Sequence, residues 1–224
     1  MNQAKNTKSK IEKSNDNNVA LNLFKYLRCS IIINNKKKNM FEASVYSGRR
    51  NRLKNQMGSG ICLFPGNVDS SFNYPANTFH FRQDSNFLYF FGLNHPGMAG
   101  VVDADSGEEW IFANDVDIDD IIWMGNQPSV KDQAAEVGIG KTAPYAKLAD
   151  YLSDALSKGR KVHFLPPYRG ETIIELSNLL NISTSKVKPG ASQRLIMAVV
   201  DQRSVKDAGE IAEIEKAVDV AYLM

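Results

Sequence analysis

The sequence predicts an α/β domain whose mixed sheet is flanked by helices on both faces, preceded by a disordered basic tail. Of its 224 residues, 43% are hydrophobic and 23% are charged, as in an ordinary soluble globular protein. After residue 40, strand-like and helix-like segments alternate, which is typical of a sheet covered by helices. The turn Asp105-Ser106-Gly107 joins two strand-like segments, so the sheet should contain an antiparallel hairpin.

Charge and composition divide the chain into three parts. Residues 1–39 hold nine of the 27 Lys and Arg but only two of the 25 Asp and Glu, so the net charge is +7 there and −5 in the remainder. This polar stretch cannot bury enough surface to fold, and we expect it to be disordered. Met40 is a candidate start of the conventional sequence. The expected division is a tail at 1–39, a domain at 40–204, and a linker or first helix of a further domain at 205–224.

Helix and strand signals begin just after Met40. The first helix is expected over residues 41–57, and it carries a basic cluster of Arg49, Arg50, Arg52 and Lys54. The apolar run at 61–64 predicts a buried strand. The loop at 65–78 is long enough to be a functional or interface loop.

The segment 79–97 is rich in aromatic residues but fits no single secondary-structure period. With Asp84 or Ser85 as N-cap and Gly92 after its last turn, the pattern predicts a short buried helix. Strands at 98–103 and 109–112 then form the hairpin.

Five further helices and one strand complete the prediction. Asn114 or Asp115 is expected to cap a helix that runs through Trp123. Apolar residues three and four positions apart predict the other helices, and a short apolar run predicts the strand. These helices are expected at 146–157, at 170–181, at 192–204 and from Asp207 onward, and the strand at 161–165.

No residue pattern identifies an active site. Gly138-Ile139-Gly140-Lys141-Thr142 lacks the first glycine of a phosphate loop, because that position is Ala135, so a helix end is expected there. Asp115, Asp117 and Asp119 lack the glycine and the glutamate of a calcium loop. None of the three histidines belongs to a zinc-binding H-E-x-x-H pattern, and His163 is expected to be a core residue. We assign no catalytic or metal-binding residue to this chain.

Residues 82–92, RQDSNFLYFFG, continuing to Asn94 and Pro96, resemble the signature of the aminopeptidase P family, of the creatinase and prolidase type. The resemblance continues through 109–112 and 121–125, in the family's order, to a closing helix around Glu210. It implies the amino-terminal domain of a manganese-dependent Xaa-Pro aminopeptidase, which removes the first residue of peptides with proline second. In that family a pita-bread catalytic domain follows and holds two manganese ions.

The resemblance also implies partners and one site residue. The implied partners are the catalytic domain, further copies of the chain in a homo-oligomer, and proline-containing peptides as substrates. Trp123 matches a family tryptophan that reaches a neighbouring subunit's active site, although a helix-face tryptophan packed in the core fits equally well. The metal ligands would all lie in the catalytic domain, so this chain alone is expected to be inactive and to bind no metal.

Two other classes of function stay open. The fold could serve as a freestanding, non-catalytic interaction module, or the basic tail could bind nucleic acid through its charge. Prolidase or creatinase specificity also stays open, because the catalytic domain sets it. Cys62 is expected to be a core thiol and Cys29 lies in the tail, so no disulfide framework is indicated. With no convincing secretory signal, the expected location is the cytoplasm.

Overall fold

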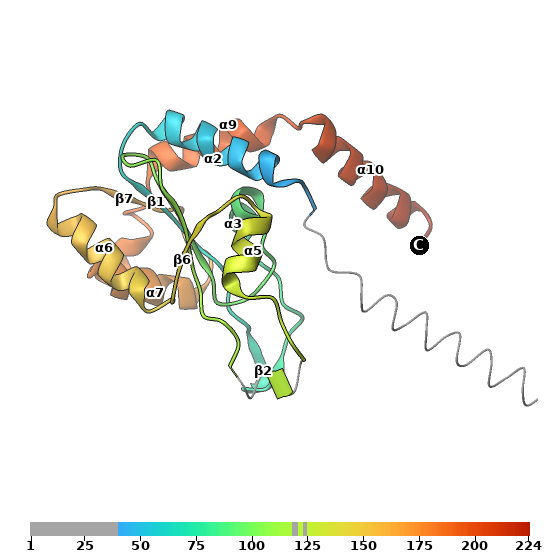
Figure 1. The fold of residues 1–224 in the computed structure, drawn as a ribbon, viewed down its shortest axis with the longest axis horizontal. Coiled ribbons are helices and arrows are strands. Elements are labelled where there is room, and N and C mark those ends of the chain that lie inside the picture. The colour runs from blue at the N-terminus through green and yellow to red at the C-terminus, as the bar shows by residue number, and fades with distance from the viewer. Residues whose placement is uncertain (1–39, 118–120, 123–124) are drawn as a thin grey trace, which may run out of the picture. The chain divides into compact units, whose positions relative to one another are not determined.

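The computed structural model describes residues 40–117, 121–122 and 125–224. The chain forms a mixed α/β domain (Figure 1). Its strands are β1 (Ile61–Pro65), β2 (Ser71–Tyr74), β3 (Asn77–Thr78), β4 (Ala99–Asp103), β5 (Glu109–Phe112), β6 (Lys141–Ala143) and β7 (Val162–His163). Its helices are α2 (Ala43–Met57), α3 (Ser85–Phe91), α5 (Val130–Glu136), α6 (Lys147–Ser157), α7 (Gly170–Leu180), α8 (Thr184–Val187), α9 (Gln193–Ser204) and α10 (Ala208–Tyr222).

The main sheet has the strand order β6-β5-β4-β1-β7. Strand β4 is antiparallel to both β1 and β5, whereas β1 pairs in parallel with β7 and β5 pairs in parallel with β6. Four strands therefore run in one direction and β4 runs against them, which confirms the predicted mixed sheet. The carboxyl ends of β1, β5, β6 and β7 consequently meet at one edge.

Helices cover both faces of this sheet, as predicted. Along β1 the side chains alternate, so Cys62 and Phe64 join one buried cluster while Ile61 and Leu63 join the other. Residues of α2, α3, α5 and α9 pack in the first cluster, and residues of α6, α7 and α8 pack in the second. Cys62 is a buried core thiol, as expected, and burial raises its pKa to about 12.

The short helix in the aromatic segment is confirmed as α3. The Asp84 carboxylate accepts hydrogen bonds from the backbone N–H groups of Asn86 and Phe87, and Gly92 ends the helix in the left-handed conformation at φ 67°. A Cβ atom at Gly92 would lie 2.3 Å from the Tyr46 ring, so glycine is needed for space as well as for φ. Because α3 is buried on several sides, its apolar residues show no single stripe.

The predicted loop at 65–78 was partly wrong, because it contains the β2–β3 hairpin. Strand β2 is exposed along its whole length, and its alternation of Phe72 and Tyr74 with polar residues is only four residues long. It lies in a segment dense in Gly, Asn, Asp, Ser and Pro, which is typical of a loop. The strand predicted at 161–165 is shorter, because β7 covers only Val162–His163. Strand β6 and helix α8 were not predicted, and of α5 only the end was predicted. The glycines at 138 and 140 do follow a helix, because Gly138 lies two residues after α5 at φ 78°.

The capping role predicted for Asn114 or Asp115 is not observed in the part of the chain that is described. Instead, Asp115 accepts a hydrogen bond of 2.6 Å from the N–H of Val130 at the start of α5, and Asn114 accepts one of 3.0 Å from the N–H of Tyr145. Of the helix predicted to run through Trp123, residues 121 and 122 are helical, and the N–H of Ile121 donates to the carbonyl of Asp117 at 3.1 Å. Residues 118–120 and 123 lie outside the described residues. Within the described residues, no helix is long and apolar enough to cross a membrane.

Candidate functional site

Two arginines of the predicted basic cluster are buried rather than solvated. The Arg50 side chain is fully buried, and it donates to Glu109 at 2.7 Å, to the Phe90 carbonyl at 2.8 Å and to the Val137 carbonyl at 2.9 Å. Burial lowers the pKa of Arg50, and the neighbouring Glu109 opposes that shift. Because its donors are used internally, Arg50 joins α2, α3, β5 and the end of α5 and leaves no cation for a substrate.

Arg49 links the domain to its last helix. Its guanidinium donates to the Tyr89 carbonyl at 3.0 Å and to Glu210 of α10 at 3.2 Å, and its Cζ lies 4.0 Å from the centre of the Tyr89 ring. Glu210 also completes the capping box that Asp207 opens at the start of α10. The first turn of α10 is therefore fixed to α2 by a buried charge.

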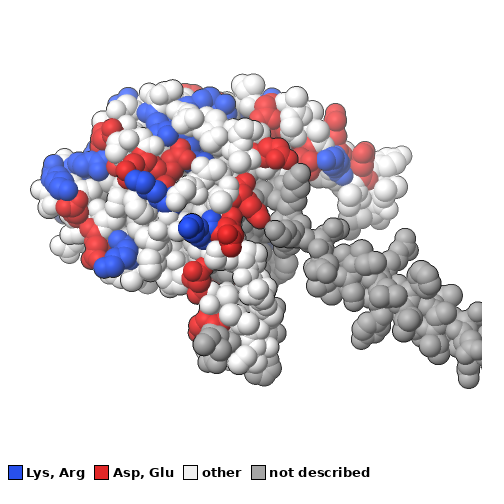
Figure 2. Space-filling model, viewed as in Figure 1, with Lys and Arg blue, Asp and Glu red and all other residues white. Residues whose placement is uncertain are grey.

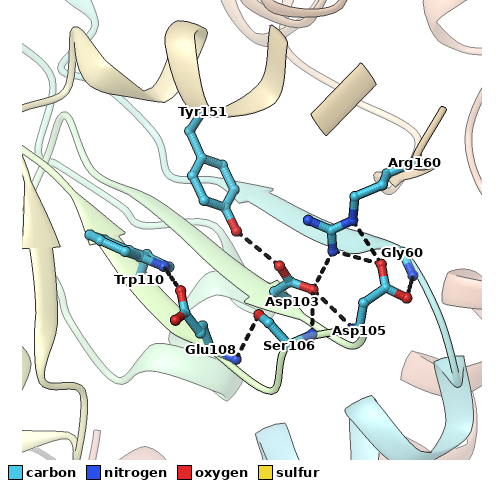
Figure 3. Close-up of polar contacts among 8 residues, drawn as sticks. All are labelled: Gly60, Asp103, Asp105, Ser106, Glu108, Trp110, Tyr151 and Arg160. Carbon is cyan, nitrogen blue, oxygen red and sulfur yellow. Dashed lines mark hydrogen bonds and ion pairs between the residues drawn. The ribbon is translucent and has the colours of Figure 1, made fainter. Parts of the chain in front are cut away.

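A second polar cluster surrounds Asp103, at the end of β4 (Figure 3). Its carboxylate accepts hydrogen bonds from the N–H groups of Asp105 and Ser106, from the Tyr151 hydroxyl and from Arg160. Burial would raise the pKa of Asp103, but these donors, Arg160 first, hold it below its ordinary value. A carboxylate with so many internal donors holds the hairpin turn in place and is poorly suited to accept a proton from a substrate.

The described residues contain no group of three or more His, Cys, Asp or Glu side chains able to hold a metal ion. His163 is buried, as expected, with its Nδ1 atom 2.7 Å from the Ser192 hydroxyl, and burial lowers its pKa. Asp115 binds the start of α5, and Asp119 lies outside the described residues.

The apolar stripe of α10 is exposed. Ile211, Ile214 and Val218 are 46%, 48% and 60% exposed, and no residue of this helix is buried. Figure 1 shows α10 extending from the layer of α2 and α9, away from the sheet. An apolar face of this kind is typical of a helix that packs against a partner.

The second exposed apolar feature is the β2–β3 hairpin. Phe72, Tyr74 and Phe79 are each more than half exposed, and the Phe72 and Phe79 rings contact each other edge to face at 5.0 Å. The hairpin follows the carboxyl end of β1 in the chain, and Figure 1 shows β2 beyond that end of the sheet. The segment after β5, which leaves the sheet at the same edge, contains Ile122, and this side chain is 71% exposed. Trp123 itself lies outside the described residues, so its predicted role is not tested here.

Charge gives no competing interface on the face in view in Figure 2. There, Lys and Arg are interspersed with Asp and Glu and do not form a basic stripe of the kind that follows a nucleic acid backbone. The candidate functional surface therefore consists of the α10 stripe and the carboxyl edge of the sheet with its hairpin.

Comparisons with known proteins point to one family. Residues 46–163 match the family described as the aminopeptidase P N-terminal domain. A probable Xaa-Pro aminopeptidase of Metarhizium robertsii is 23% identical over 167 residues, which cover 74% of this chain and 34% of the relative. The mitochondrial intermediate cleaving peptidase 55 of Arabidopsis thaliana is 27% identical over 173 residues, which cover 75% of this chain and 35% of the relative. The chain thus spans about a third of the length of these relatives.

Solved structures show the same fold. The aminopeptidase PepP of Pseudomonas aeruginosa matches with a TM-score of 0.62 at 23% identity, over 77% of this chain and 40% of that one. The low-pH form of Escherichia coli aminopeptidase P matches with a TM-score of 0.54 at 20% identity, over 63% of this chain and 33% of that one. In both cases the match covers well under half of the solved enzyme.

Proposed function

This chain belongs to the family of aminopeptidase P N-terminal domains, and on that premise we propose that it is the assembly and access domain of an Xaa-Pro aminopeptidase. The observation that carries the proposal is the family match together with the exposed apolar faces, which a partner could cover. The described residues hold no metal-binding cluster. The complete enzyme would remove the first residue from peptides whose second residue is proline.

The α10 stripe supports docking of a catalytic domain. The side chains of Ile211, Ile214 and Val218 are in contact with water in this chain. A partner that packed against them would stabilise the assembly by about 25 cal/mol for each Å² of apolar surface that it covered. The buried contact between Arg49 and Glu210 fixes the direction in which α10 leaves the domain. We propose that this direction sets the position of the catalytic domain.

The carboxyl edge of the sheet supports the access role. The hairpin exposes three aromatic rings, those of Phe72, Tyr74 and Phe79. We propose that these rings contact a proline-containing peptide or a second copy of the chain. We propose that the segment containing Trp123 takes part in such a contact with a neighbouring subunit. The proposed assembly is a homo-oligomer.

The proposed catalysis belongs to the other domain. Two manganese ions there would polarise the scissile carbonyl and supply a bridging hydroxide as the nucleophile. The residues of this chain would position that domain and limit which peptides reach it.

We also propose a cellular location for this protein. Cys62 is a buried free thiol, which is compatible with the reducing cytoplasm that we propose. Mitochondria are the alternative location. Residues 1–39 are basic and poor in acids, as transit peptides are, and the Arabidopsis relative is named as mitochondrial. A fluorescent fusion of the full chain, compared with one that starts at Met40, tests this: mitochondrial signal that disappears with residues 1–39 would contradict the cytoplasmic proposal.

The coding sequence downstream of residue 224 tests the proposed function. We expect it to continue into a domain that contains two Asp, one His and two Glu as metal ligands. A stop codon there, or a continuation without those ligands, would contradict the proposal and favour a freestanding interaction module.

A further inference from the structure

A pocket of about 520 Å³ opens at the carboxyl edge of the sheet and is not used by any role described above. Its walls follow three strands of the same direction: Gly66 and Val68 follow β1, Tyr145 follows β6, and Arg169 follows β7. Helix α7 closes the remaining side. In α/β sheets, ligands bind beyond the carboxyl ends of the strands, and this volume is in the range of small-molecule sites.

The pocket is mostly apolar, and its lining includes two carboxyl groups, those of Glu171 and Glu175. Glu175 accepts a hydrogen bond from the Tyr145 hydroxyl, and among the described residues it has no cationic partner. Burial alone raises the pKa of Glu175 to about 7. An ammonium group in the pocket would supply the positive charge that this carboxylate lacks.

A cation lies at the mouth of the same pocket. Arg169 donates through Nη1 to the Val68 carbonyl at 3.2 Å, and its Nε lies 3.7 Å from Glu171. Its Nη2 has no partner among the described residues. Held in this way by its other nitrogens, the guanidinium can offer Nη2 to a carboxylate.

We propose that this pocket binds a free α-amino acid with a bulky apolar side chain. The ammonium group lies against Glu175 and the carboxylate against Arg169. The side chain lies against Val68, Ile174 and Leu179, of which Ile174 is 58% exposed. This inference does not rest on the proposed peptidase function.

Calorimetry with three probes tests it on the full chain at about pH 8, where the Glu175 carboxyl is ionised. L-Leucine carries both charges, leucinamide lacks the carboxylate, and isocaproate lacks the ammonium group. We expect saturable binding of leucine and at least about tenfold weaker binding of each truncated probe, because each loses one charged hydrogen bond.

Variants assign each charge to its side chain. Glu175→Gln should weaken leucine about tenfold and leave isocaproate unchanged, whereas Arg169→Gln should weaken leucine and leave leucinamide unchanged. Asp154→Asn, an exposed acid of α6 that pairs only with Lys158, is the matched control and should bind leucine normally. The absence of saturable leucine binding, or equal leucine affinity for Glu175→Gln and the unchanged chain, would overturn the proposal.

Discussion

Arg50 is the side chain whose loss should destabilise this domain most. Replacing it by Met removes the ion pair with Glu109, which keeps its second partner Lys54 at 2.9 Å, and leaves the buried carbonyls of Phe90 and Val137 without their donor. We expect Arg50→Met to lower the free energy of unfolding by about 2–5 kcal/mol, because each buried acceptor left without a donor costs about 1–3 kcal/mol. Urea denaturation followed by circular dichroism measures this change.

Arg52 provides the matched control on the same helix. It is exposed, two residues from Arg50, so Arg52→Met should change the free energy of unfolding by less than about 0.5 kcal/mol. Equal losses for the two variants would show that burial of Arg50 contributes nothing specific.

Glu175 should make stability depend on pH. Its pKa in the folded chain is raised by burial to about 7, above the value in the unfolded chain. The folded state therefore holds a proton that the unfolded state has lost between about pH 4.5 and pH 7, so this contribution to stability is lost as the pH rises through that window. In Glu175→Gln the contribution is absent, so the variant should gain stability relative to the unchanged chain at about pH 8. Urea midpoints at both ends of the window check this; a constant difference between the two proteins would contradict it.

The backbone amides of helix α10 should be less protected from hydrogen exchange than those of α2, which has the same length of 15 residues. Helix α10 has no buried residue and is held mainly through its first turn, whereas β1 is buried and paired on both sides, with β4 and β7. We expect hydrogen exchange at Ile211 and Val218 to be much faster than at Leu63. Equal protection would mean that α10 packs on this domain.

The contact at the start of α10 should govern that exchange. Arg49→Met removes the ion pair with Glu210, so exchange over the first turn of α10 should quicken while exchange in β1 stays unchanged. Unchanged exchange at Glu210 in this variant would contradict a tethering role.

A contact could be predicted from the sequence when the two groups that form it lie only a few residues apart along the chain. Helix α3 was predicted correctly because its signals are local: Asp84 binds N–H groups two and three residues away, and Gly92 ends the last turn. The burial of Arg49 and Arg50 could not be predicted, because their partners Glu210 and Val137 lie 161 and 87 residues away. Helical spacing alone places an arginine on a solvated face as readily as on a buried one.

The candidate surfaces show the same limit. The α10 stripe is visible as Ile211, Ile214 and Val218 at helical spacing, and the structure adds that this domain leaves it uncovered. The pocket at Glu175 has no local motif, because its walls come from three segments that only the sheet order brings together. The exposed hairpin was missed because its strands bury no alternate residue.

At the scale of the whole molecule, we propose that this chain positions another domain, and that the metal ligands of the peptidase lie in that other domain. Peptide hydrolysis by two metals needs several carboxylates and a histidine that converge on rigid elements, and the described residues hold no such group. Three of the least exposed acids each form an ion pair with an arginine: Asp103 with Arg160, Glu109 with Arg50, and Glu210 with Arg49.

The most direct measurement is the release of the first residue from a peptide with proline second, with and without manganese. It is made on the purified 224-residue chain and on the same chain extended through the catalytic domain that we propose to follow it. The account predicts no turnover by the first protein and manganese-dependent turnover by the second. Metal-dependent turnover by the 224-residue chain that survives further purification would contradict it.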